Sequence, residues 1–261
     1  MSANEQAIAA PRRMNPYWSM RIRQFKAIVR MEISKNFLGR RAILLYLMAL
    51  APIGVVSLFA IQATLTRQAV RAGELNVIFA GIFQALIVRN VVFFGCAWMF
   101  MNLFRGDIVD KSLHYYFLVP ARREVVVTGK YVAGLIASAV LFGLTTIFSV
   151  ALLVATAKYL VGGGDSAAVV SVAQALKYLS ITALACAAYG GVFLLVGLFF
   201  RNPIIPALVL YGWEWINFLL PPVLKRISVV HYIDSLSPVP LSQGPLALVG
   251  EPTAAWLSII S

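Results

Sequence analysis

Two ionisable side chains, Arg89 and Glu214, stand within long apolar stretches of the sequence. An isolated charge in the hydrocarbon core of a membrane is costly, so each side chain must find a partner or face water. We therefore expect Arg89 and Glu214 to form an ion pair, or Glu214 to face a translocation cavity. The alternative is that Arg89 extends to the outer interface and that Glu214 is a satisfied structural acceptor.

No other group of residues has the spacing of a catalytic, metal or cofactor site. The sequence lacks the phosphate loop G-x-x-x-x-G-K-[ST], and it also lacks H-E-x-x-H, C-x-x-C and G-x-S-x-G. His114 and His231 are predicted to lie on opposite sides of the membrane, and Cys96 and Cys186 lie in apolar stretches where packing is their expected role. We expect no catalytic, cofactor-binding or metal-binding residue in this chain, and no enzymatic activity of its own.

The elements that must position Arg89 and Glu214 are apolar helices. Of the 261 residues, 61% are apolar and only 12% are charged, whereas soluble proteins have about 25% charged residues. A membrane core about 30 Å thick is crossed by about 20 apolar helical residues. The sequence predicts an all-α polytopic membrane protein with one transmembrane domain, residues 42–261, and with five complete spans: 42–63, a second ending at 104, 131–157, 174–200 and 203–224.

Two parts of this pattern, the second span and the last residues of the sequence, are less regular. Apolar character of the second span begins at Val77, but Gln84, Arg89 and Asn90 interrupt it, so either one long tilted helix or a shorter one entered near Phe83 is expected. Thr253–Ser261 is apolar but too short to cross a membrane, and we interpret it as the start of a sixth span.

Basic residues predict the orientation. Nine of the 22 Lys and Arg precede the first span, five lie between the second and third spans, and Arg201 lies between the fourth and fifth. Six lie at the opposite ends of the spans. The positive-inside rule then places the N-terminus in the cytoplasm and residues 225–252 in an outer segment. The net charge of +12 is thus explained by the basic residues of the cytoplasmic loops, and no nucleic-acid partner is expected.

Residues 19–41 have a one-sided apolar pattern. A helix there places five apolar side chains in one arc and most basic side chains outside it. We expect an interfacial amphipathic helix against lipid head groups; the alternative is a solvated helix that packs on its own protein. Residues 1–18 are polar, contain Pro11 and Pro16, and predict a disordered cytoplasmic tail without a signal peptide.

The polar segment between the second and third spans carries a family resemblance. It contains Asp110-Lys111-Ser112-Leu113, then Leu118-Val119-Pro120-Ala121-Arg122-Arg123-Glu124, then Gly129-Lys130. In this order and placement the motifs resemble those of ABC-2 type permeases, the membrane subunits of ABC transporters. Residues 19–41 resemble the elbow helix of that family, and the spacing of spans agrees over essentially the whole chain. Lys111 and Ser112 depart from the usual Gly and Thr, and the sixth span of the family is not present before Ser261.

The resemblance implies a permease that forms a homo- or heterodimer and binds a separate ATPase subunit, which holds ATP and Mg²⁺. ATP-driven closure of the ATPases would alternate access to a path between the two permeases, usually for export, in the inner membrane of a bacterial or archaeal cell and in contact with membrane lipids. Besides the elbow helix, the residues implied to couple to the ATPase are Asp107, Asp110, Ser112, Pro120, Arg122, Arg123 and Glu124. The sequence does not identify a substrate.

Two other functions share parts of this pattern. A membrane assembly or maturation factor with the same fold would have every feature above. A membrane-embedded enzyme would need clustered carboxylates, histidines or a nucleophile at membrane depth, and the sequence offers only Glu214 and a lone Arg89 there.

Overall fold

The described part of the chain is helical throughout its regular elements. The computed structural model describes residues 16–39, 42–66, 72–109, 123–160, 170–200, 202–216 and 228–239, and these ranges contain no strand. The helices are α1 (Pro16–Leu38), α2 (Ala42–Leu65), α3 (Ala72–Ile82), η1 (Phe83–Val92), α4 (Phe93–Val109), α6 (Arg123–Leu160), α7 (Val172–Phe199), α8 (Ile204–Ile216) and α10 (Val229–Leu236).

Four helices are long and apolar enough to cross a membrane, which confirms the predicted class of all-α membrane protein. They are Ala42–Leu65, Gly73–Leu103, Glu124–Lys158 and Val172–Phe199. Each contains more than the about 20 residues that cross a hydrocarbon core. The predicted first, third and fourth spans lie within these helices or differ by one or two residues at their ends.

The predicted fifth and sixth spans do not add to this number. The fifth begins as α8, which has 13 residues. At 1.5 Å per residue, α8 is about 20 Å long, less than the thickness of a hydrocarbon core. The rest of the predicted fifth span, 217–224, and the start of a sixth at Thr253–Ser261 lie outside the described residues, as do residues 1–15 of the predicted tail 1–18. Residues 16–18, predicted to belong to that tail, form the first turn of α1.

The second span is one long helix, as the first of the two interpretations expected. It runs without a break through α3, η1 and α4, and its middle ten residues form a π-helix. A π-helix widens the turn and leaves backbone carbonyls with altered partners, and such segments are frequent at functional sites. Here the Asn90 side-chain amide donates to the carbonyl of Ala85, five residues earlier (2.6 Å). The polar residues that interrupt the apolar pattern therefore lie within the π-helix.

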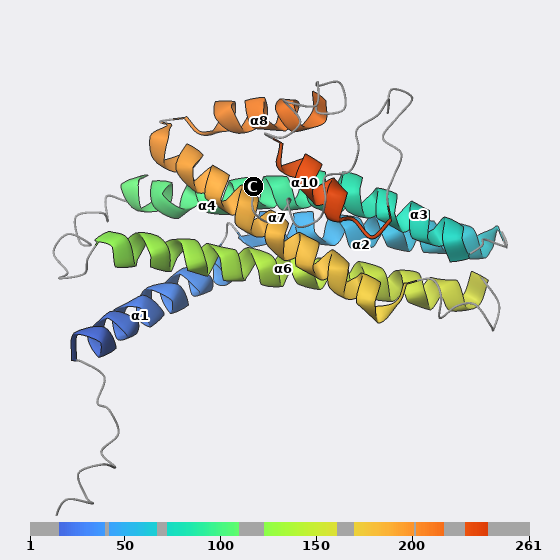
Figure 1. The fold of residues 1–261 in the computed structure, drawn as a ribbon, viewed down its shortest axis with the longest axis horizontal. Coiled ribbons are helices and arrows are strands. Elements are labelled where there is room, and N and C mark those ends of the chain that lie inside the picture. The colour runs from blue at the N-terminus through green and yellow to red at the C-terminus, as the bar shows by residue number, and fades with distance from the viewer. Residues whose placement is uncertain are drawn as a thin grey trace, which may run out of the picture.

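The long helices run side by side along the long axis of the molecule, and α7 crosses in front of α4 and α6 (Figure 1). α7 packs against both α4 and α6, α2 packs on α6, and α1 lies against the first half of α6. Glycines permit the closest approaches. The ring of Phe100 from α4 lies between Gly134 of α6 and Gly190 of α7, where an added Cβ would come within 2.8 Å and 2.7 Å of the ring, respectively.

Buried polar groups on the spans bind one another or nearby carbonyls. Thr146 of α6 and Thr182 of α7 share a hydrogen bond of 3.1 Å, and the Tyr131 hydroxyl of α6 donates to the Ala187 carbonyl of α7 (3.0 Å). In lipid the hydrophobic effect does not drive helices together, so close packing and these interhelical hydrogen bonds hold α6 against α7.

A substitution at the closest backbone contact tests this packing. A Cβ at Gly197 of α7 would lie 2.9 Å from the Cα of Met101 in α4, and backbone cannot rotate away as a side chain can. We predict that Gly197→Ala lowers the free energy of unfolding in detergent by about 1–3 kcal/mol. The matched change Gly54→Ala, whose Cβ meets nothing within 4 Å, should leave stability unchanged or slightly raised. Equal unfolding midpoints for the two variants would show that α4 and α7 are not this close.

Candidate functional site

Arg89 lies at membrane depth. It follows Gly73 by 16 residues and precedes Leu103 by 14, and these two residues bound the second spanning helix. Along an ideal helix these separations are about 24 Å and 21 Å. A hydrocarbon core about 30 Å thick contains Arg89 wherever it is placed along this helix. The guanidinium must therefore be matched by another group.

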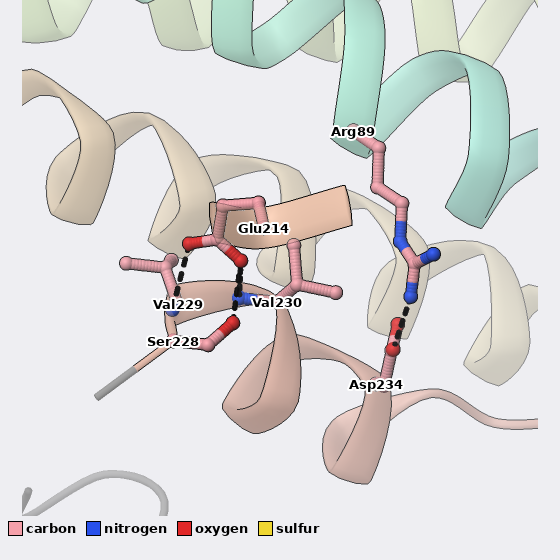
Figure 2. Close-up of polar contacts among 6 residues, drawn as sticks. All are labelled: Arg89, Glu214, Ser228, Val229, Val230 and Asp234. Carbon is pink, nitrogen blue, oxygen red and sulfur yellow. Dashed lines mark hydrogen bonds and ion pairs between the residues drawn. The ribbon is translucent and has the colours of Figure 1, made fainter. Parts of the chain in front are cut away.

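The partner of Arg89 is Asp234 of α10. Arg89 Nη2 donates to Asp234 Oδ2 at 2.9 Å, and the two side chains are 25% and 12% exposed (Figure 2). The expected ion pair between Arg89 and Glu214 is not formed, and this prediction was wrong. Asp234 competes successfully because α10 folds against η1 and α7, which brings its carboxylate directly to the guanidinium.

Glu214 holds the beginning of α10. Its carboxylate accepts hydrogen bonds from the backbone N–H groups of Val229 (3.0 Å) and Val230 (3.3 Å) and from the Ser228 hydroxyl (Figure 2). The first N–H groups of a helix have no partner within it, and a negative charge there is favoured by the helix dipole. Glu214 is thus a satisfied structural acceptor, as the alternative interpretation held, and it fastens α8 to α10.

α10 consequently packs on the bundle. In the described part of the predicted outer segment 225–252, Val230 and Ile233 are fully buried against the bundle, and Asp234 reaches Arg89. Beside it, the Tyr211 hydroxyl of α8 donates to Asn90 Oδ1 of η1 at 2.7 Å. Two of the three polar side chains of the π-helix, Arg89 and Asn90, are therefore bound by α10 and α8, respectively.

A second buried ion pair joins α1 to the spans. Lys130 Nζ of α6 donates to Glu32 Oε1 of α1 at 2.9 Å and to the Leu103 carbonyl of α4 at 3.0 Å. Lys130 is 1% exposed and Glu32 is 4% exposed. The preceding residue, Gly129, allows α1 to approach, since a Cβ there would lie 3.1 Å from Ile28. The Gly129-Lys130 motif thus has a physical role: the glycine admits α1 and the lysine binds its carboxylate.

This contact also shows that α1 packs on its own protein. Phe25, Ile28 and Glu32 fall on one face of α1, and that face meets α6. Arg23, Lys26 and Arg30 are exposed. α1 therefore packs on its own protein along one side, and these three basic residues lie on its exposed side.

Sequence reasoning missed Glu32 and Asp234. A signal was present, because the chain has only ten acidic residues against 22 basic ones. Glu32 is the single acidic residue of α1, and Asp234 is the single one of the apolar α10. Within apolar or basic helices, a lone carboxylate is a candidate for a buried ion pair.

The implied coupling residues lie mostly outside the described part of the chain. Asp110, Ser112, Pro120 and Arg122 are not among the described residues. Glu124 is exposed in the first turn of α6. Arg123 begins α6 and Asp107 lies near the end of α4, so the structure places their backbones at the end of the bundle where Glu32 and Lys130 meet.

The described side chains contain no group of three His, Cys, Asp or Glu that could hold a metal ion. Comparison with protein-family models, with curated proteins and with solved structures found no match to this chain.

Double-mutant cycles distinguish the two possible partners of Arg89. We predict that Arg89→Met and Asp234→Ala, measured singly and together by unfolding in detergent, show a coupling energy of about 1–3 kcal/mol. The cycle of Arg89→Met with Glu214→Gln should show a clearly smaller coupling, because these side chains share no hydrogen bond in Figure 2. A larger coupling with Glu214 than with Asp234 would contradict the observed pairing.

Lys130 offers a test of the α1 contact. We predict that Lys130→Met destabilises the protein by about 3–5 kcal/mol, because Glu32 is then a buried charge without its closest cation. Adding Glu32→Leu should recover much of this loss. Lys35, 3.6 Å from the same carboxylate but 51% exposed, provides the control, and Lys35→Met should cost no more than about 1 kcal/mol. Equal losses for the two lysine variants would argue against a buried pair.

Proposed function

We propose that this chain is the membrane-spanning permease subunit of an ATP-driven transporter of the ABC-2 type, coupled to a separate ATPase subunit. The observation that supports this best is the buried junction of Glu32, Lys130 and the Leu103 carbonyl. It joins α1, α4 and α6 at one end of the bundle, at both borders of the polar segment that resembles the coupling region of the family.

Such a junction suits the transmission of force. A partner that pushes on residues between α4 and α6 acts on two helices that are already joined to α1, because Lys130 binds both the α1 carboxylate and an α4 carbonyl. α4 in turn packs tightly on α7 through Phe100 and Gly190. A displacement at this end therefore moves α1, α4 and α6 together and reaches α7.

In this proposal the work is divided between two subunits. The partner ATPase supplies ATP and Mg²⁺ chemistry, and this chain supplies the helices and the contact surface. In this proposal the junction end faces the cytoplasm, a second permease copy completes the path, and export is the direction. The exposed basic residues Arg23, Lys26 and Arg30 would lie along the same cytoplasmic side, close to lipid head groups and to the ATPase.

The test is whether an ATPase binds at that end. The tagged full-length chain, purified from its native membrane in mild detergent, should retain a subunit that contains a phosphate loop and hydrolyses ATP. We predict that the charge reversals Arg122→Glu and Arg123→Glu, made together, reduce the amount of copurified ATPase at least about tenfold, a loss of about 1.4 kcal/mol in association, and leave membrane insertion intact.

The matched control reverses two charges at the other end of the bundle. Lys158 of α6 and Lys177 of α7 are exposed there, and Lys158→Glu with Lys177→Glu makes the same change in net charge. This control should retain the ATPase. Loss of the ATPase from both variants, or from neither, would refute the coupling assignment, and purification without any nucleotide-hydrolysing subunit would refute the permease proposal.

A further inference from the structure

The side of the bundle formed by η1 and α10 carries charges that are partly exposed. The side chains of Arg89 and Asp234 are 25% and 12% exposed. Arg89 lies at membrane depth, and Asp234 lies at the same depth because its carboxylate binds the guanidinium at 2.9 Å. Asn90 and Ser235, the residues that follow these two in the sequence, are partly exposed as well. Contact of such a surface with hydrocarbon would be costly.

The outward faces of two spanning helices are different. Between residues 136 and 155 of α6, every exposed side chain is apolar, and the serines and threonines are buried. Between residues 181 and 199 of α7, the exposed side chains are again apolar. Lipid tails are as apolar as these side chains and can cover them. The side formed by η1 and α10 is thus set apart from the lipid-facing sides of α6 and α7.

The exposed ion pair requires hydrogen bonds rather than a further charge. Arg89 and Asp234 neutralise each other, so no opposite charge has to come from outside. A guanidinium offers five N–H donors and a carboxylate about four acceptor sites, and only Arg89 Nη2 is seen to bind Asp234. The buried Nε of Arg89 has no acceptor among the described residues. Water satisfies donors and acceptors alike, whereas hydrocarbon satisfies neither.

η1 extends this surface by one more exposed residue. Ala85 is exposed, and the Asn90 side-chain amide donates to its carbonyl, so the two residues lie on the same side of the π-helix. The polar face consists of Ala85, Arg89 and Asn90 of η1 with Asp234 and Ser235 of α10.

We propose that the polar face borders water at membrane depth. Its charges are matched but partly exposed, and water is the surrounding that solvates them without a second protein surface. For the permease proposed above, and resting on that proposal, the polar face lines the path, and the substrate that passes along it is hydrophilic.

Cysteines introduced on the polar face test for this water, because the reactive thiolate forms in water and not in hydrocarbon. The native Cys96 and Cys186 are fully buried, so the unsubstituted chain serves as the blank. A charged methanethiosulfonate reagent is applied to both sides of the membrane that contains the full-length chain. We predict that Ala85→Cys and Ser235→Cys react at least about tenfold faster than the lipid-facing control Ala183→Cys.

Ala183 of α7 matches Ala85 in side chain, exposure and depth. Ala85 follows Gly73 by 12 residues and precedes Leu103 by 18, about 18 Å and 27 Å along a helix. Ala183 follows Val172 by 11 residues and precedes Phe199 by 16, about 17 Å and 24 Å. A core about 30 Å thick therefore contains both positions.

The proposal requires fast labelling at both positions of the polar face. Labelling of Ala85→Cys or of Ser235→Cys no faster than that of Ala183→Cys would overturn it. Equally fast labelling of all three variants would also overturn it, because the reagent would then reach a lipid-facing position as readily. The labelling needs no ATPase, so its outcome is separate from that of the copurification experiment.

Discussion

The structure depends on one constraint: a charge inside a membrane protein must be matched within the protein. Among the described residues, three acidic side chains are buried or nearly buried in or beside the bundle, and each has a defined partner. Glu32 binds Lys130, Asp234 binds Arg89, and Glu214 binds the start of α10. Replacing water by hydrocarbon makes each unmatched group costly. The three carboxylates therefore determine where α1, α8 and α10, the short or peripheral helices, attach to the long ones.

The long helices are held to one another by a different kind of contact. Their contacts are aromatic rings and glycines, as where Phe100 lies between Gly134 and Gly190, supplemented by interhelical hydrogen bonds such as Thr146–Thr182. Such packing is specific in shape, but it involves many small contributions. α8 and α10 contact the long helices through few residues, so a single ion pair or capping carboxylate has a larger share in their position. Polar contacts thus matter most where the apolar contacts are fewest.

This difference explains what the sequence could predict. The spans were predictable because length and apolar composition are local properties, and Arg89 and Glu214 were identifiable because charge within an apolar stretch is also local. Their partners were not, since Arg89 and Asp234 are 145 residues apart and Lys130 and Glu32 are 98 apart. Asp234 also lies in a segment with prolines that resembles a loop, and its burial follows only from the packing of α10. Gln84, Arg89 and Asn90 marked an irregular part of the second span in the sequence, but they did not predict a π-helix there or the contact of Asn90 with Tyr211, which is 121 residues away.

The same contacts join the helices into two units. Glu214 joins α8 to α10 through three hydrogen bonds, whereas these helices are joined to η1 by Arg89–Asp234 and Asn90–Tyr211. α8 and α10 thus form one unit that contacts the bundle across the π-helix. At the end of the bundle where α4 ends and α6 begins, Lys130 joins α1, α4 and α6 into a second unit. A rearrangement that separates α10 from the bundle must break the Arg89–Asp234 ion pair. Because an unmatched charge at membrane depth is costly, this pair holds α10 against the π-helix.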